Sequence, residues 1–196
     1  MIQVGIIGGA GYTAGELIRI LLRHPEVNLN FIYSTSQAGK AVSHIHQDLL
    51  GETELHFSGV ISKDVDVLFL CLGHGNSIKF LKEHDFSEKT KIIDLSTDFR
   101  MASEDHSFVY GLPEFNREAI KGAQFIANPG CFATAISLAI LPLAAENLLK
   151  DAVHVNAVTG ATGAGTSLSE TTHFTWRDNN FSAYKAFEHQ HLNEIG

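Results

Sequence analysis

A glycine-rich turn near the N-terminus constrains the fold of this chain more than any other feature. The apolar run at residues 3–7 leads into Gly8-Gly9-Ala10-Gly11-Tyr12-Thr13-Ala14, and apolar residues at helical spacing follow until Pro25. The turn matches the pattern G-x-G-x-x-G/A, which joins a strand to a helix in dinucleotide-binding folds. It therefore predicts a parallel α/β domain in which the amides at the helix start hold a diphosphate. The expected cofactor contacts in this turn are Gly8, Gly9, Gly11, Tyr12, Thr13 and Ala14.

The remaining apolar segments alternate between strand and helix patterns along the chain. Further strands are predicted at residues 27–33, 65–72, 91–95, 124–127 and 153–158, and helices at 14–23, 77–83 and 131–149. This interleaving predicts a doubly wound, Rossmann-type NADP-binding domain over residues 1–130. Residues 131–196 are expected to begin an α+β catalytic domain. Because only one strand is predicted after the long helix, we expect the chain to be truncated.

Composition and charge exclude several classes of function. A formal net charge of −8, with no block of Lys or Arg, argues against binding to nucleic acid or to an anionic membrane surface. No apolar run approaches the roughly 20 residues that a membrane span requires, and no signal peptide is recognisable. The two cysteines, Cys71 and Cys131, form no CxxC pair. A cytoplasmic, reducing location with free thiols is therefore expected.

The end of the second predicted strand indicates which dinucleotide is bound. An NAD enzyme uses Asp or Glu there to bind the ribose hydroxyls, but the segment 33–40 contains no acid. Ser34, Ser36 and Lys40 instead suit a 2′-phosphate, so the sequence favours NADP. Gly73 follows the next buried strand, where we expect the backbone to pass close to the cofactor. The adjacent His74 is interpreted as a loop residue.

Cys131 is the candidate nucleophile, because it lies in Asn128-Pro129-Gly130-Cys131 at the start of an apolar helix. A thiol at a helix N-terminus experiences the positive end of the helix dipole, which favours the thiolate. The alternative is that Cys131 is a small buried side chain, as free cysteines often are. Cys71 lies inside an apolar strand and is interpreted as a core residue.

Two later segments supply candidate partners for this thiol. The Gly- and Thr-rich turn 159–166 contains Gly163 and offers backbone amides to a phosphate or an acyl oxygen. His191 and Glu194 are three residues apart and would be neighbours on a helix, with His189 just before them. Histidine is a common general acid or base, and a carboxylate can orient it. No metal site is predicted, because no cluster has zinc-like spacing.

Six motifs occur in order along the chain: GGAGYTAGEL at 8–17, DLSTDFR at 94–100, YGLPE at 110–114, NPGC at 128–131, TGAG at 162–165 and HQHLNEI at 189–195. Taken together, they resemble the N-acetyl-γ-glutamyl-phosphate reductase family of arginine biosynthesis. The resemblance covers essentially the whole chain. It implies an NADPH-dependent oxidoreductase related to aspartate-semialdehyde dehydrogenase. It also implies a homo-oligomer, either dimer or tetramer, and a chain longer than this one.

The resemblance implies that Cys131 is the nucleophile and that His189, His191 and Glu194 complete the catalytic set. The thiolate would expel phosphate from a γ-acyl phosphate, and the resulting thioester would be reduced to the semialdehyde. On spacing alone, His191 is the preferred acid/base, and His189 is placed nearer the substrate phosphate. Phe132, Ala133 and Thr166 depart from the residues usual in the family.

Several alternatives remain open at this point. The acyl phosphate could carry an N-succinyl or an aminoadipyl group, or the chain could be an aspartate-semialdehyde dehydrogenase. A non-enzymatic NADP-binding regulator with a structural Cys131 is the alternative of another class. Whether these 196 residues are active alone is also left open.

Overall fold

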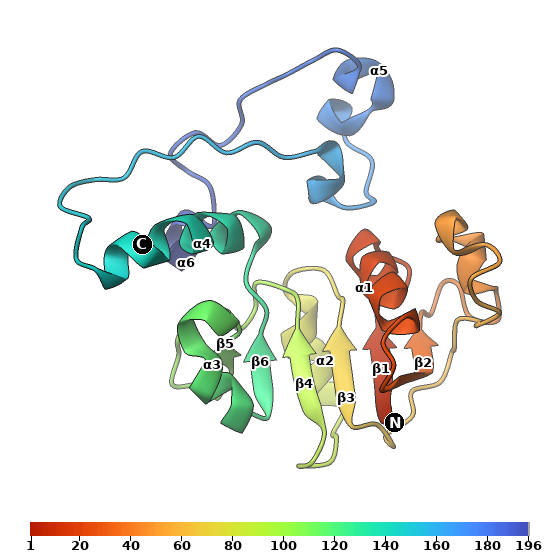
Figure 1. Cartoon of the computed structure of the whole chain (residues 1–196). Coiled ribbons are helices and arrows are strands. Elements are labelled where there is room, and N and C mark those ends of the chain that lie inside the picture. The colour runs from red at the N-terminus through yellow and green to blue at the C-terminus, as the bar shows by residue number, and fades with distance from the viewer. Residues whose placement is uncertain (196) are drawn as a thin grey trace.

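A six-stranded sheet forms the centre of the first two thirds of the chain (Figure 1). The computed structural model describes residues 1–195. Every strand pair is parallel, and the order across the sheet is β2-β1-β3-β4-β6-β5. The strands are β1 Ile2–Ile7, β2 Val27–Tyr33, β3 Val67–Leu70, β4 Lys91–Asp94, β5 Val109–Tyr110 and β6 Phe125–Ala127. This arrangement confirms the predicted doubly wound, Rossmann-type fold.

Helices follow most of the strands and connect them. They are α1 Tyr12–Leu22, α2 Asn76–Glu83, α3 Pro113–Gly122, α4 Cys131–Ala145, α5 Phe174–Arg177 and α6 Leu192–Ile195. Short 3₁₀ turns lie at Val42–His44, Gln47–Leu49, Ala161–Ala164 and Glu170–Thr172. In α3 the first residue is Pro113, whose fixed φ and missing N–H suit the first helical position.

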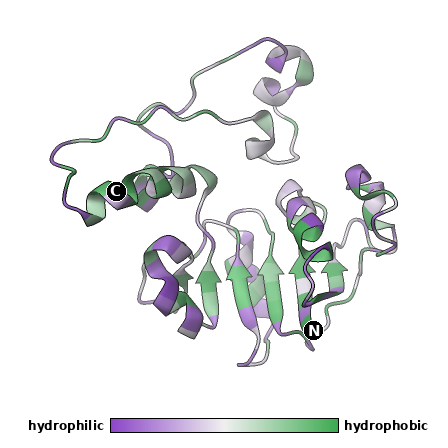
Figure 2. Ribbon diagram, viewed as in Figure 1, coloured by the Kyte–Doolittle hydropathy of each residue, from purple (hydrophilic) through white to green (hydrophobic). Residues whose placement is uncertain are grey.

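Two apolar clusters, one on each face of the sheet, stabilise the fold. On the α1 face, Ile6 and Ile32 pack with Ile18 of α1, and Phe57 completes the cluster. On the α2 face, Leu68 and Ile92 pack with Phe80. Figure 2 shows the central strands as largely hydrophobic, as expected of strands covered on both faces.

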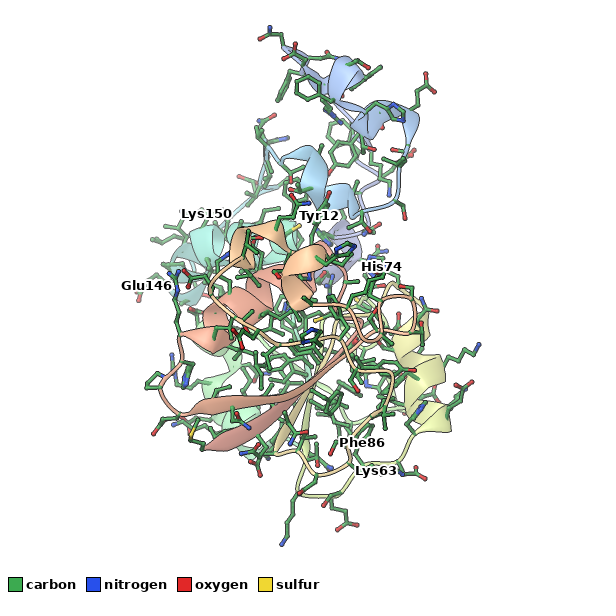
Figure 3. The ribbon with its side chains drawn as sticks, turned by 90° about the vertical axis from the view of Figure 1, so that its right-hand side faces the viewer. Tyr12, Lys63, His74, Phe86, Glu146 and Lys150 are labelled. Carbon is green, nitrogen blue, oxygen red and sulfur yellow. The ribbon has the colours of Figure 1, made fainter. Side chains whose placement is uncertain are left out.

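The fold defines where a ligand can bind. The connection from β1 runs outward to β2, whereas the chain then crosses back to β3 on the other side of β1. In open α/β sheets, ligands bind outside the carboxyl ends of the strands at such a switch point. Figure 3 shows Tyr12 and His74, which follow β1 and β3, near each other at this end of the sheet, with Lys63 and Phe86 at the opposite end.

Most predicted elements are confirmed, with shifts of a few residues at their ends. The predicted helix 131–149 ends earlier, at Ala145, and the predicted strand 65–72 shortens to β3. The strand predicted at 153–158 is wrong, because this segment is exposed and irregular. Its alternating pattern requires a neighbouring strand and a core, and residues 1–195 provide neither there. β5 and α3 are additional elements that were not predicted.

Residues 131–195 are packed much less densely than the sheet region. After α4 the chain forms long irregular segments that pass above the carboxyl edge of the sheet and return to α6, which lies beside α4 (Figure 1). Gly196, the last residue of the predicted second domain, lies outside the described residues.

Candidate active site

The glycine turn after β1 has the geometry of an anion site. Gly8 adopts φ +82°, and a Cβ there would lie 2.5 Å from the carbonyl oxygen of Cys71, so only glycine fits. The N–H groups of Gly8 and Gly9 both donate to the carbonyl of Tyr33, at 3.1 and 2.9 Å. These bonds fasten the turn to the end of β2. The turn is therefore anchored at Gly8 and Gly9 and places the start of α1 at the switch point.

Several amides of this turn are available to a ligand. Within residues 1–195, the N–H groups of Ala10, Tyr12 and Thr13 have no backbone acceptor, whereas Gly15 donates to Gly11 at 3.0 Å. The first turn of α1 contains no acidic side chain. Free amides and the positive end of the helix dipole together favour a phosphate group here. The predicted contacts Gly8 to Ala14 thus lie together in one cradle.

The candidate residues in the segment after β2 differ in their exposure to solvent. Ser34 is buried, and its N–H donates to the carbonyl of Ser58 at 3.1 Å. Ser36 and Lys40 are exposed, and Nζ of Lys40 lies 3.0 Å from Oε1 of Gln37. Ser36 and Lys40 can therefore reach a ligand in solution, whereas Ser34 anchors the loop.

The loop after β3 is held by the segment that follows β4. Nδ1 of His74 accepts a hydrogen bond from the N–H of Thr97 at 3.1 Å. The carboxylate of Asp98 accepts the N–H groups of Gly75 and Ser77, at 2.6 and 3.0 Å. These contacts cap α2 and fix Gly73 beside the switch point.

The two cysteines lie in opposite environments. Cys131 is exposed and is the first residue of α4. Cys71 packs against the core on the α1 face, and burial raises the pKa of its thiol to about 12. Of the two thiols, Cys131 is the one that a ligand can reach.

The two histidines lie side by side close to Cys131. Their ring centroids are 4.7 Å apart, and the ring of Phe132 lies 5.1 Å from His189 and 6.0 Å from His191. The hydroxyl of Tyr184 is 3.5 Å from Nε2 of His189. The structure therefore brings together the residues that sequence reasoning grouped around the thiol.

The two rings differ in exposure and in hydrogen bonding. His191 is buried, and its burial lowers the pKa of the ring below the usual histidine value. Its Nδ1 is buried without a hydrogen-bond partner in residues 1–195. Nδ1 of His189 accepts the N–H of His191 at 3.2 Å, so a neutral His189 carries its proton on Nε2. His189 is only half-buried and can reach a ligand.

Glu194 joins three segments of the chain at the site. Its Oε1 accepts the hydroxyl of Tyr110 at 2.9 Å and the N–H of Gly130 at 2.8 Å. Its Oε2 lies 3.4 Å from Nη1 of Arg100 and 4.0 Å from Nε2 of His191. The carboxylate thus hydrogen-bonds the residue before Cys131, and it lies near His191 without a hydrogen bond to that ring.

Arg100 and Tyr110 also line the candidate site, although neither was predicted as a site residue. Arg100 also donates from Nε to the carbonyl of Asn128 at 2.9 Å and from Nη2 to that of Leu95 at 3.0 Å. The Arg100 and Glu194 side chains are only 7% and 5% exposed, so each charge needs the other. A carboxylate at the helix end requires a cation, and Arg100 follows a strand whose carboxyl end lies at the same edge. Arg100 could therefore have been predicted from its position after β4.

Gly130 allows this close packing. A Cβ there would collide with Nε2 of His191 and lie 2.7 Å from Nη1 of Arg100.

The pKa of Tyr110 is raised, mainly by burial and to a lesser extent by the hydrogen bond to Glu194. Its hydroxyl therefore remains a proton donor at neutral pH.

The turn that contains Gly163 stands apart from these contacts. It forms an exposed 3₁₀ turn, in which the N–H of Gly163 donates to the carbonyl of Gly160 at 3.1 Å. That amide is therefore already used within the turn.

In the described part of the chain, no group of three or more His, Cys, Asp or Glu side chains could hold a metal ion. Among residues 1–195, no helix combines the length and the apolar character needed to cross a membrane.

Solved structures share this fold at low sequence identity. Aspartate semialdehyde dehydrogenase II of Vibrio cholerae, complexed with ASA, superimposes with a TM-score of 0.58 at 20% identity, covering 84% of this chain and 48% of that one. Aspartate semialdehyde dehydrogenase from Candida albicans, solved with NADP, gives a TM-score of 0.56 at 17% identity, covering 76% and 48%. These likenesses establish the fold alone.

Curated relatives are similar along the whole chain. N-acetyl-gamma-glutamyl-phosphate reductases are 76% identical in Christiangramia forsetii, 64% in Flavobacterium johnsoniae and 57% in Bacteroides fragilis. Each alignment covers 100% of this chain but only 61%, 62% and 61% of the relative. The chain thus spans about three fifths of the length of these relatives.

Two family models match the chain in sequence order. Residues 3–123 match the semialdehyde dehydrogenase NAD-binding domain, and residues 131–196 match the semialdehyde dehydrogenase dimerisation domain. The first match covers the parallel sheet, and the second begins at Cys131. The chain belongs to the semialdehyde dehydrogenase family.

Proposed function

We propose that the full-length protein reduces N-acetyl-γ-glutamyl phosphate to N-acetylglutamate 5-semialdehyde with NADPH. The observation that carries this proposal is the exposed thiol of Cys131 at the start of α4, with His191 packed against Gly130 directly before it. Relatives with this name are up to 76% identical to the chain, which supports the choice of substrate.

The chemistry assigned to the chain begins at Cys131. Its thiolate attacks the acyl carbon, a C–S bond forms, the C–O bond to phosphate breaks, and phosphate leaves with the electron pair. NADPH, when bound, supplies the hydride that reduces the thioester. His191 then gives a proton to the oxyanion of the hemithioacetal and takes it back as the C–S bond breaks, so that the thiolate leaves with the electron pair and the aldehyde is released. Because the acyl phosphate is already activated, positioning of these groups is the main task of the protein.

The glycine turn would hold the diphosphate of the cofactor. The free amides of Ala10, Tyr12 and Thr13 and the closely packed Gly8 suit a phosphate at the start of α1. The exposed Ser36 and Lys40 would bind the 2′-phosphate, and the segment 33–40 has no acid that would repel it. Gly73 would pass close to the cofactor. Gly163, which we also predict to contact the cofactor, lies in an exposed turn.

We extend the proposal to the organisation of the protein. Residues 1–130 would form the cofactor domain, and residues 131–196 would begin the catalytic domain. The similarity of residues 131–196 to a dimerisation domain supports a homo-oligomer, either dimer or tetramer. Two free cysteines that are not paired with each other suit a reducing cytoplasm.

A reverse-direction assay of the full-length enzyme tests this function. Semialdehyde, phosphate and NADP are supplied, and formation of NADPH is followed. N-acetylglutamate semialdehyde should be used with the highest kcat/KM, ahead of the N-succinyl compound and of aspartate semialdehyde. A higher kcat/KM with the N-succinyl compound or with aspartate semialdehyde would contradict the proposed substrate but not the proposed thioester chemistry. No turnover with any of them, while NADP still binds, would instead support a regulator with a structural Cys131.

Cofactor preference is tested in the same assay. Because Ser36 and Lys40 stand where an NAD enzyme has an acid, kcat/KM with NADP should exceed that with NAD at least tenfold, about 1.4 kcal/mol. Lys40→Ala should reduce this ratio, and Lys63→Ala at the opposite end of the sheet is the matched control. An equal or better kcat/KM with NAD would contradict the assignment.

A further inference from the structure

A buried histidine that is not among the predicted site residues contacts the glycine turn through the carbonyl of Gly9. His46 lies between the 3₁₀ turns Val42–His44 and Gln47–Leu49 and is 8% exposed. Its Nε2 is 2.7 Å from the carbonyl oxygen of Gly9. None of the motifs that identify the family includes this residue.

The chemistry of this contact defines the state of the ring. A carbonyl oxygen can only accept a hydrogen bond, so Nε2 of His46 must carry the proton. The neutral ring therefore exists as the Nε2–H tautomer. The other side of the ring packs against α1, where a Cβ on Gly15 would lie 2.5 Å from Nδ1. The ring of Phe57 is tilted against it at a centroid distance of 6.1 Å. His46 thus has little freedom to turn.

The bond to Gly9 also orients the next amide. In a trans peptide the C=O and the following N–H point in nearly opposite directions, and residues 1–195 contain no cis peptide bond. When His46 holds the Gly9 carbonyl, the N–H of Ala10 is directed away from His46. Within residues 1–195, this amide has no backbone acceptor. The direction of the Ala10 N–H is therefore fixed, and this N–H remains available to bind a ligand.

We propose that His46 is a positioning residue for the cofactor diphosphate, which fixes the Gly9–Ala10 peptide so that the Ala10 amide faces the ligand. The inference rests on the proposed function, since it assumes that NADPH binds at the glycine turn. The N–H groups of Gly8 and Gly9 already hold the turn to Tyr33, but these bonds leave the carbonyl of Gly9 free to rotate with its peptide. His46 removes that freedom before the cofactor arrives, which lowers the entropic cost of binding.

The test compares two amides of different reach in the full-length protein. In His46→Gln the side-chain NH₂ reaches about as far as Nε2, whereas in His46→Asn it is one carbon shorter and cannot reach the carbonyl. Dissociation constants are measured by fluorescence titration with NADPH and by competition with adenosine 2′-phosphate, which lacks the diphosphate. His44→Asn is the control, because His44 is exposed in the same segment.

Loss of one neutral hydrogen bond should raise the Kd for NADPH about 3- to 10-fold in His46→Asn. His46→Gln should restore it to within about twofold, and adenosine 2′-phosphate should bind equally to all variants. Equal weakening of both ligands would overturn the inference, because a purely structural histidine would act on the whole domain. Unchanged NADPH binding in His46→Asn would also overturn it. If the wild-type protein fails to bind NADPH, the proposed function fails and the inference fails with it.

Discussion

Residues 1–130 and residues 131–195 bury their apolar side chains to very different degrees. The first region covers both faces of its sheet, with Ile6, Ile18 and Leu68 fully buried. In the second region, Ala133 is the one buried apolar side chain of α4 among the described residues, although this helix is apolar on all sides. A helix of that kind is normally covered by other elements. The first region therefore carries its own core, whereas the second requires surfaces beyond those of residues 1–195.

The site lies where the two regions meet. Arg100 and Tyr110 come from the sheet region, and Glu194 comes from the end of the second region. Their contacts place His191 beside Gly130 and so beside Cys131. A well-packed sheet thus provides the fixed side of the candidate site, and the loosely packed region supplies the side chains that we propose to react.

The largest expected effect distinguishes the two cysteines, one from each region. Cys131→Ser in the full-length enzyme should lower kcat by a factor on the order of 10⁴–10⁶, because a nucleophile is lost. NADPH binding, measured by fluorescence, should be retained. Cys71→Ser is the matched control and should keep its turnover, since that thiol packs against the core and its raised pKa keeps it protonated. Near-normal turnover of Cys131→Ser would refute the thioester route.

The next effect distinguishes the two histidines. His191→Asn should reduce kcat about 10²–10⁴-fold with little change in KM, as for loss of a general acid or base. His189→Asn should mainly raise KM, by the roughly 0.5–1.5 kcal/mol of one neutral contact. Steady-state kinetics of both variants measure this split. The reverse pattern would exchange the two roles, and an unchanged pH–rate profile in both would make the pair structural.

Titration of His191 sharpens the same comparison. Burial lowers its folded-state pKa below the usual value of about 6.5, so the folded protein binds fewer protons than the unfolded chain. This residue therefore contributes stability above about pH 6.5 that is lost as the pH falls toward the folded-state pKa. An NMR titration of the His191 ring should give a value below 6.5. A value above 6.5 would mean that the charge of Glu194 outweighs the burial.

A smaller effect tests the difference in packing directly. Leu68→Ala in the 196-residue chain should lower the free energy of unfolding by about 2–5 kcal/mol, because it leaves a cavity in the core. Leu143→Ala on the exposed side of α4 should change it by less than about 0.5 kcal/mol. Urea denaturation measures both. Equal losses would show that α4 is packed as well as the sheet.

The sequence predicts the first region well and the second poorly, for a physical reason. The segments of β1, β2 and α2 could be recognised because their apolar residues recur with the period of a buried strand or helix. β5 was missed because a two-residue strand carries little of that signal. α3 was missed because it is mostly polar and buries none of its residues. The segment 153–158 alternates as a strand does, but alternation creates no strand without a partner.

The site could be predicted only in part. Cys131, His189, His191 and Glu194 were identified from motifs, and the structure places them together. The contacts of Glu194 with Tyr110 and Arg100 join residues 84 and 94 positions apart. Local spacing carries no information about such long-range pairs. They depend on which strands end at the same edge of the sheet.

Trapping the acyl enzyme tests the central claim, a thioester on Cys131, most directly. Full-length enzyme is mixed with N-acetylglutamate semialdehyde and NADP in the absence of phosphate, so that the acyl group cannot be transferred. The thiol adds to the aldehyde, the adduct loses a hydride to NADP, and the thioester accumulates. We predict one NADPH per active site, with an N-acetylglutamyl adduct on the Cys131 peptide by mass spectrometry and neither signal in Cys131→Ser. A burst of NADPH that persists in Cys131→Ser, or an adduct on another residue, would contradict the account.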